Sequence, residues 1–221
     1  MALIEVKDES AGYANNIVLS DLNFSIVSGE RIALVGESGA GKSTLLKMIY
    51  ERFNGSAALV PQDLGLVKAL TVFHNVYMGQ LHNQSLIRNF RNLLWPRKAD
   101  VLEVKKVLKK LRLEDKLFSG VGELSGGQQQ RTAVGRALHH SGKLFIADEP
   151  VSSVDENQAR EILGTINREK ETVVVAMHDR ALAIEYCDRL IGIKGGRVVI
   201  DEPSAGMKSE ELDALYRLSN K

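Results

Sequence analysis

The segment GESGAGKST, at positions 36–44, constrains this chain more than any other. It matches the pattern G-x-x-x-x-G-K-[ST] and stands between the apolar run RIALV at 31–35 and a helix-like run, TLLKMIYERF, at 44–53. A strand that leads through such a loop into a helix supports the match, because the glycines let successive backbone N–H groups point inward around a phosphate. Within this predicted phosphate-binding loop, Lys42 is expected on the β- and γ-phosphate oxygens and Ser43 on Mg²⁺.

The rest of the chain alternates strand-like and helix-like segments. Strands are expected at 2–6, 22–26, 31–35, 57–60, 143–148, 172–177, 189–194 and 197–201, with helices at 156–168 and 180–186. The polar stretch 8–16 is predicted as a turn. This alternation favours a parallel or mixed α/β sheet.

A block at about 71–140 interrupts the alternation and is predicted to be helical, which suggests an inserted subdomain. Within 99–113, apolar residues recur on one helix face and lysines occupy the other: Val101, Val104, Leu108 and Leu111 against Lys105, Lys106, Lys109 and Lys110. The lysine face is expected to be a solvated surface, with acidic lipid head groups or nucleic acid as alternatives. Trp95 and Cys187 are expected to be packing residues.

Composition narrows the class of protein. The formal net charge of +1 does not suggest nucleic-acid binding, and the single Cys187 excludes an internal disulfide and fits a reducing compartment. No apolar run is long enough for a membrane helix, and the first ten residues do not resemble a signal peptide. We therefore expect a soluble cytoplasmic protein that reaches a membrane only through a partner.

Polar side chains follow several of the predicted strands. Asp148 and Glu149 end the buried run LFIAD, where an open α/β sheet binds its ligands. There Asp148 can hold Mg²⁺ and Glu149 can polarise an attacking water, although a surface carboxylate pair is the alternative. His178 and Gln62 end two other strands, and position alone leaves their contact with a γ-phosphate or metal open. Tyr13 could stack on a base or pack as a rim tyrosine.

A second glycine-containing turn, LSGGQQQR at 124–131, precedes a predicted helix over 128–138. A hydroxyl and two glycines before a helix also form an anion cradle. One small protein would then carry two phosphate cradles.

These motifs occur in the order typical of one family, and over its whole length the chain resembles the ATP-binding cassette (ABC) ATPases. The resemblance implies a single α/β P-loop NTPase domain, 1–221, with a core of about 1–70 and 141–221 and a helical signature subdomain of about 71–140. It further implies a mixed sheet and a reduced antiparallel β subdomain, because the stretch between Thr44 and Gln62 is shorter than in most relatives.

The resemblance also assigns roles to residues of this chain. ATP and Mg²⁺ are the implied cofactors, with metal ligands Ser43, Gln62 and Asp148 and catalytic residues Glu149, His178, Gln62 and Lys42. Nucleotide contacts are implied for Tyr13, Gly36, Glu37, Ser38, Gly39, Ala40, Gly41, Lys42, Ser43, Thr44, Ser125, Gly126, Gly127, Gln128 and Asp155. Asp155 ends the segment SSVD, in which Val154 replaces the usual leucine.

In this family the signature turn contacts ATP that is held by a second subunit. The implied partners are therefore a second ATPase chain packed head to tail, transmembrane permease subunits and a substrate-binding protein, with the chain on the inner face of the cell membrane. Apolar residues after Gln62 (Leu64, Leu66, Val67 and Leu70) either pack inside the subdomain or receive a short permease helix.

The segments ADEPVSSVD, HNVYMGQL and DRALAIEYCDRLIGIKGGRVVID resemble phosphonate-importer ATPases. LSGGQQQR is shared with ATPases of lipoprotein release and macrolide efflux, so these remain alternatives. A soluble, non-transport ABC protein is a further alternative, as is a catalytically silent subunit, against which Glu149 and His178 argue.

Overall fold

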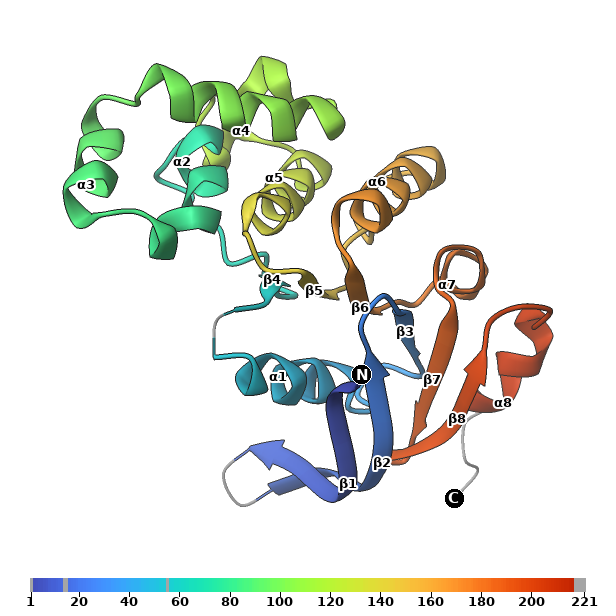
Figure 1. The fold of residues 1–221 in the computed structure, drawn as a ribbon. Coiled ribbons are helices and arrows are strands. Elements are labelled where there is room, and N and C mark those ends of the chain that lie inside the picture. The colour runs from blue at the N-terminus through green and yellow to red at the C-terminus, as the bar shows by residue number, and fades with distance from the viewer. Residues whose placement is uncertain (1, 14–15, 55, 217–221) are drawn as a thin grey trace.

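The structure is a computed structural model that describes residues 2–13, 16–54 and 56–216. A sheet with helices on both faces occupies one half of the molecule, and a group of helices extends from it to one side (Figure 1). No helix of the described ranges has both the length and the apolar character to cross a membrane.

Two sheets organise the strands. β1 and β2 form an antiparallel pair, and the main sheet has the order β4-β5-β6-β3-β7-β8, parallel except for the antiparallel β7–β8 pair. The strands are β1 (Ala2–Tyr13), β2 (Asn16–Val27), β3 (Arg31–Val35), β4 (Ala58–Val60), β5 (Leu144–Asp148), β6 (Thr172–Ala176), β7 (Arg189–Lys194) and β8 (Arg197–Pro203).

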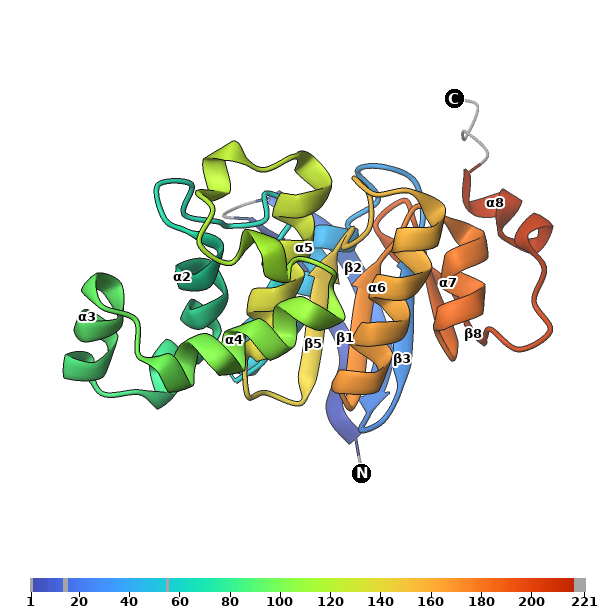
Figure 2. The same ribbon diagram turned by 90° about the horizontal axis from the view of Figure 1, so that it is seen from above.

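The helices are α1 (Lys42–Arg52), α2 (Val72–Tyr77), α3 (Leu86–Leu94), α4 (Lys98–Lys110), α5 (Gly126–His139), α6 (Glu156–Glu169), α7 (Arg180–Tyr186) and α8 (Asp213–Tyr216). In both ribbon views, α2, α3 and α4 lie away from the main sheet, and α5 lies between them and α6 (Figure 2). The predicted mixed α/β cassette fold, with helices interrupting the strand–helix alternation, is confirmed.

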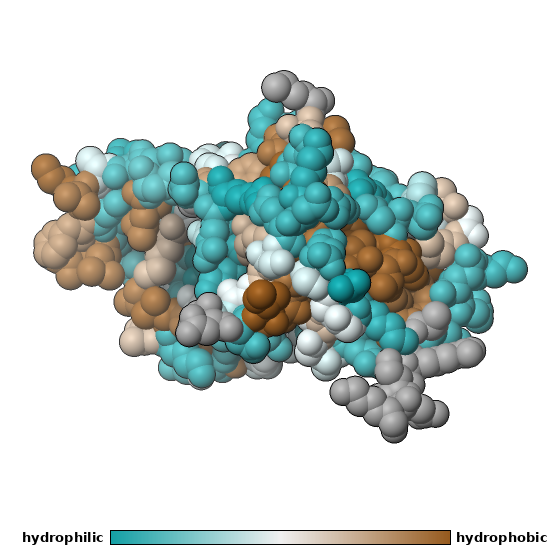
Figure 3. Space-filling view, turned by 90° about the horizontal axis from the view of Figure 1, so that it is seen from below, coloured by the Kyte–Doolittle hydropathy of each residue, from teal (hydrophilic) through white to brown (hydrophobic). Residues whose placement is uncertain are grey.

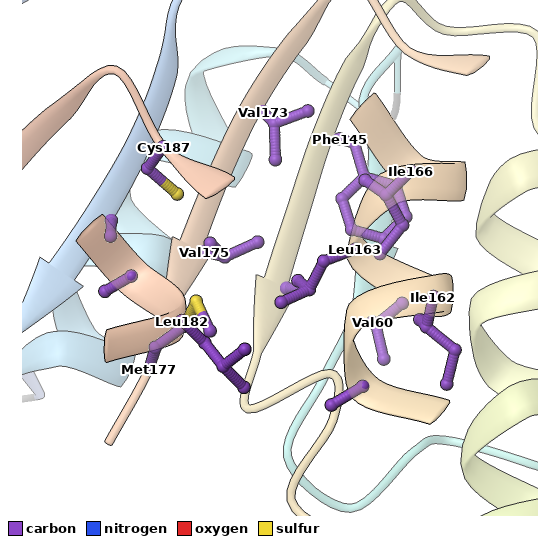
Figure 4. Close-up of a cluster of buried hydrophobic side chains, with 14 of the residues drawn as sticks. Val60, Phe145, Ile162, Leu163, Ile166, Val173, Val175, Met177, Leu182 and Cys187 are labelled. Atoms are coloured by element: carbon purple, nitrogen blue, oxygen red, sulfur yellow. The ribbon is translucent and has the colours of Figure 1, made fainter. Parts of the chain in front are cut away.

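The main sheet is buried on both faces. α1 and the β1–β2 pair cover one face through Leu45, Ile49 and Phe24, which cluster with Leu34 of β3. On the other face, α5, α6 and α7 pack against the sheet, and Figure 4 shows Ile166 and Leu182 with neighbouring side chains from β5 and β6. Continuous apolar strands such as β3 and β6 are therefore dictated by burial on two sides.

The helical group has a separate core. Phe73, Val104, Leu108 and Val121 are fully buried in it. Lysines on the opposite face of α4 are exposed, as predicted, and two of them pair with glutamates: Lys106 with Glu103 and Lys110 with Glu169.

Three local predictions were wrong. Residues 8–13 continue β1 rather than forming a turn, because the antiparallel pairing with β2 extends to Tyr13 with irregularities in register. α5 begins at Gly126, two residues earlier than expected, because Ser125 caps it. Trp95 is 72% exposed rather than packed, whereas Cys187 is buried as expected.

Candidate functional site

The loop between β3 and α1 is built around Lys42. Its side chain is buried and turns back on the loop, where Nζ donates to the carbonyl oxygens of Gly36 (2.7 Å) and Glu37 (2.9 Å). α1 begins at Lys42 after Gly41, which supplies no side-chain cap. The first N–H groups of α1 therefore remain available to an anion at the positive end of the helix.

Glycine is required at two positions of this loop. Gly36 has φ +147°, and a Cβ there would lie 2.3 Å from the carbonyl oxygen of Ile193. Gly41 has φ +108°, and a Cβ would lie 2.5 Å from Leu19 Cδ2. Both the backbone conformation and the close approach exclude a larger residue.

The ends of the central strands meet at one cavity. Gln62 follows β4, Asp148 ends β5 and His178 follows β6, and the parallel strands place these ends at the same edge of the sheet. The cavity has a volume of about 300 Å³ and is lined by Tyr13, Val18, Ser38, Gly39, Gly41, Lys42, Ser43, Thr44, Gln62, Asp148, Glu149 and His178. The predicted acid, amide and imidazole residues and most of the predicted loop residues are thus brought together, whereas Gly36, Glu37 and Ala40 do not line this cavity.

His178 and Glu149 are in direct contact at this cavity. His178 Nε2 lies 2.7 Å from Glu149 Oε1, and both side chains are partly exposed. Glu149 has φ +55°, an uncommon conformation for a residue other than glycine, and its N–H donates to Ala176 O of β6 (3.0 Å). The backbone therefore holds Glu149 in a strained turn directly after β5, with its carboxylate toward the cavity.

Charge is arranged so that Lys42 faces acidic groups. Burial lowers the pKa of the Lys42 ammonium, and the negative charges of Glu149 and Asp148 oppose this shift. The two carboxylates favour the charged form of Lys42 but repel an incoming polyanion, so the attraction for phosphate comes from the partly desolvated ammonium itself and from the N–H groups of the loop.

Three oxygen-bearing side chains at the cavity suit a hard cation. Ser43, Gln62 and Asp148 line this cavity together, and they also line an adjoining groove of about 670 Å³. Hydroxyl, amide and carboxylate oxygens are the ligands that Mg²⁺ prefers, beside phosphate oxygens and water. The described residues contain no cluster of three or more His, Cys, Asp or Glu side chains that could hold a metal ion.

Tyr13 lies at the rim of the same region. Its ring lines the cavity and the adjoining groove, is 46% exposed, and lies 4.7 Å from Lys47 Nζ of α1. An exposed ring at the mouth of a phosphate cradle offers a flat face for a nucleobase.

The signature turn does not reach this cavity. Among the described residues, none from Leu124 to Gln128 belongs to the lining of the phosphate-loop cavity. Ser125 and Gln128 instead form a capping box: Ser125 Oγ accepts from Gln128 N (3.3 Å), and Gln128 Oε1 accepts from Ser125 N (3.0 Å). Gly127 packs closely on the Ser153 backbone, where a Cβ would lie 2.9 Å from the carbonyl oxygen. The N-terminus of α5 is therefore exposed and lies apart from the phosphate-loop cavity of its own chain.

Asp155 acts as a helix cap in this structure. Its Oδ1 accepts from Gln158 N (2.9 Å) at the start of α6, and the Gln158 side chain also donates to it. Among the described residues, the lining of the phosphate-loop cavity does not include Asp155.

Sequence reasoning missed Gln130, which connects α5 to the strained turn. Gln130 is fully buried; its Nε2 donates to Glu149 O (2.7 Å), and its Oε1 accepts from Ser153 N (2.8 Å). A signal was present: Gln130 lies three, four and seven residues before Ala133, Val134 and Ala137, all of them buried on α5. A polar residue on an apolar helix face needs partners, and here the partners belong to the site.

Arg136 and Tyr216 are two further residues that sequence reasoning missed. The Arg136 guanidinium donates to the carbonyl oxygens of Leu64 (2.7 Å) and Gly65 (2.5 Å), so α5 also holds the loop after Gln62. Burial lowers the pKa of Arg136. Tyr216 of α8 accepts from the N–H of Gly36 (3.2 Å) and so ties the last described helix to the phosphate loop.

A comparison of this sequence with models of known protein families finds a match. The family model described as "ABC transporter" matches residues 19–152, which include the phosphate loop, the signature turn and the Asp148–Glu149 pair.

Curated relatives match over nearly the full length. The phosphonates import ATP-binding protein PhnC 3 of Halalkalibacterium halodurans is 33% identical, over 97% of this chain and 94% of its own length. PhnC of Lactococcus lactis is 32% identical over 97% and 99%, and PhnC of Pseudomonas putida is 34% identical over 97% and 90%.

Solved structures share the fold. The dimeric ABC transporter cassette MJ0796 superimposes with a TM-score of 0.78 at 25% identity, over 92% of this chain and 99% of its own. An ATP-binding subunit of an ABC transporter gives a TM-score of 0.76 at 27% identity, over 96% and 97%.

Proposed function

This chain belongs to the ABC transporter family and is an ATPase of that family, and we propose that it powers the import of a phosphonate or a related phosphorus oxyanion. The carrying observation is the similarity, over 97% of the chain, to proteins named as phosphonate-import ATP-binding subunits. No feature of the site favours lipoprotein release or macrolide efflux, which the signature segment also allowed.

In the proposed site, Lys42 and the N–H groups at the start of α1 hold the ATP phosphates. Lys42 exchanges its hydrogen bonds to the carbonyl oxygens of Gly36 and Glu37 for bonds to phosphate oxygens. Because the side chain is already folded back on the loop, this exchange needs only a short movement of the ammonium group. Ser38, Gly39, Gly41 and Thr44 of the same loop line the cavity. Tyr13 stacks on the adenine at the rim of the cavity. This assignment rests on the cavity lining and on charge complementarity.

Glu149 is the proposed general base. Its carboxylate accepts a proton from the attacking water, and His178, 2.7 Å away, orients that carboxylate and senses the γ-phosphate. Positioned proton transfer contributes typically about 10²–10⁴-fold in rate. Gln62 reports on the same region from the end of β4.

Mg²⁺ fits the oxygen ligands at this cavity. Ser43, Asp148 and Gln62 would hold it beside the phosphates, and the ion supplies charge neutralisation there when it is bound.

A head-to-tail dimer completes the proposed site. The α5 N-terminus of one chain, with Ser125, Gly126 and Gly127, supplies donors to the γ-phosphate held by its partner, and Asp155 lies in the same interface. Two observations support this: the turn is exposed, and it is separate from the phosphate-loop cavity of its own chain. A similar cassette has been solved as a dimer.

The permease is proposed to dock beside α2. Leu64 and Leu66 pack onto the core, so they do not form an open surface, whereas Leu70 lines an apolar groove of about 510 Å³ with Met78 and Leu81. Val67 is exposed next to it. This groove offers an apolar lining of the kind into which a short amphipathic helix packs.

A growth assay tests the proposed transported substrate. A strain deleted for this gene, and lacking other phosphonate importers, is supplied with a phosphonate as sole phosphorus source. The wild-type gene should restore growth and the Glu149→Gln gene should not, while both strains grow on inorganic phosphate. If the deletion strain grows on phosphonate without the gene, the cargo assignment is wrong and the ATPase activity is unaffected.

A further inference from the structure

Helix α3 (Leu86–Leu94) presents its polar side to the protein. Asn92 is fully buried: its Nδ2 donates to Asp100 Oδ2 (2.7 Å), and its Oδ1 accepts from Arg97 N (2.8 Å). Asn89 accepts from Tyr77 Oη (3.0 Å), and Arg88 pairs with Asp100. Hydrogen bonds and an ion pair, rather than apolar packing, therefore hold the inner face of α3.

The apolar residues of α3 face outward. Leu86 is 87% exposed, Ile87 84% and Phe90 68%, with Leu93 and Leu94 also exposed and Trp95 immediately after the helix. Helical spacing puts positions 86, 87, 90, 93 and 94 on one face. Figure 3 shows apolar side chains gathered at the end of the molecule where α3 lies in Figure 1. This arrangement is the reverse of an ordinary surface helix.

The charge around α3 is positive, which favours a binding partner with an anionic surface. From residue 64 to residue 99 the sequence contains no aspartate or glutamate, and its charged residues are all basic: Lys68, Arg88, Arg91, Arg97 and Lys98. Arg91, Arg97 and Lys98 are exposed beside the apolar face. The whole chain has a net charge of only +1, so positive charge is concentrated around α3.

We propose that the outer face of α3, with Trp95 and the adjacent arginines and lysine, binds the surface of an anionic lipid bilayer. Exposed Leu, Ile and Phe side chains can enter the headgroup–acyl boundary, tryptophan favours that boundary, and basic residues pair with anionic headgroups. A symmetric contact with a second copy would bring the same cations together, so the charge disfavours it. This lipid contact is separate from the ATPase site. Leu86, Phe90 and Leu93 of α3 also line the groove proposed for the permease, so Ile87, Leu94 and Trp95, which lie outside that groove, carry the lipid contact.

Trp95 provides a direct measurement, because it is the single tryptophan of the chain. The purified full-length protein is mixed with vesicles of phosphatidylglycerol and phosphatidylcholine or with vesicles of phosphatidylcholine alone. Anionic vesicles should shift the Trp95 emission to shorter wavelength and sediment with the protein, and high salt should weaken both effects. An unchanged emission and no sedimentation with anionic vesicles would overturn the proposal.

Matched variants separate the two components of binding. Ile87→Ser with Leu94→Ser should reduce vesicle binding by about tenfold, because apolar insertion is lost, whereas Ile17→Ser, at another exposed isoleucine on β2, should not reduce it. Arg91→Gln with Lys98→Gln should reduce binding to anionic vesicles severalfold, and Lys105→Gln with Lys109→Gln, which remove equal charge from α4, should have a smaller effect.

A partner protein is the competing occupant, and the same variants distinguish it. If the wild-type chain ignores vesicles but the Ile87→Ser, Leu94→Ser variant no longer assembles with detergent-solubilised permease, α3 is a protein-docking surface and the lipid proposal is overturned. Equal vesicle binding by the Arg91, Lys98 variant and the Lys105, Lys109 variant would overturn it as well, because the position of the positive charges would then make no difference.

Discussion

His178 and Glu149, which follow neighbouring parallel strands, are in direct contact, with 2.7 Å between Nε2 and Oε1. The contact connects the proposed γ-phosphate sensor to the proposed base. Gln130 holds the carbonyl oxygen of Glu149 from α5, so the same residue is linked to the helix that begins at the signature turn. One strained turn thereby links the proposed base to α5.

Glu149→Gln should bind Mg-ATP and hydrolyse it about 10²–10⁴-fold more slowly, because an amide cannot accept a proton from water. ATP should then accumulate a closed dimer, visible by light scattering. His178→Ala should also slow turnover without loss of ATP binding. Near-normal turnover of Glu149→Gln would contradict its role as base.

Lys42→Ala should abolish tight ATP binding, because the loop loses its one buried cation. Direct titration with a fluorescent ATP analogue measures this, and thermal unfolding without nucleotide provides the control for folding. An unchanged dissociation constant would refute the assignment of the phosphate loop.

Ser125→Arg should leave ATP binding by the isolated chain intact and should block hydrolysis, because the side chain fills the space proposed for the partner's γ-phosphate. Ser125→Asn, which keeps a capping side chain, controls for the helix cap. Mixing Ser125→Arg with Lys42→Ala chains should restore part of the activity, because one of the two composite sites is then intact. An inactive mixture of chains that still dimerise would indicate that the turn serves its own nucleotide.

Gln130→Met should lower kcat about tenfold or more, with a smaller effect on KM, because the Glu149 turn loses its partner in α5. Gln129→Ala is the neighbouring control, since its amide contacts Leu124 O instead. Steady-state kinetics over a range of ATP concentrations separate the two parameters. A change confined to KM, or equal effects of both variants, would exclude the positioning role.

The buried thiol of Cys187 should make the free energy of unfolding depend on pH. Burial raises the pKa of its thiol from 9.0 to about 12, so the folded protein retains a proton that the unfolded chain releases. The resulting stabilisation is present below pH 9 and is lost as pH rises toward 12, by at most about 1.4 kcal/mol per pH unit. Urea unfolding from pH 8 to 11 should show a steeper loss for the wild type than for Cys187→Ala. Parallel curves would contradict this.

Local sequence patterns determined much of the architecture. The phosphate loop between β3 and α1, the carboxylates that end β5 and the apolar strands all follow from residues close together in the chain, because strand and helix periodicities and loop glycines act over short spans. Polar residues at the ends of several strands further predicted that these residues lie together at one edge of the sheet.

Only the tertiary structure decided which of these residues touch. The contacts of Gln130 with Glu149, Arg136 with Leu64 and Tyr216 with Gly36 join segments 19, 72 and 180 residues apart, and they depend on how the helices pack on the sheet. The helical period also shows that α3 has one apolar and one polar face, but it does not show which face points toward the protein. Asp100 and Tyr77 bind its polar side, so Trp95 and the apolar face are left outside.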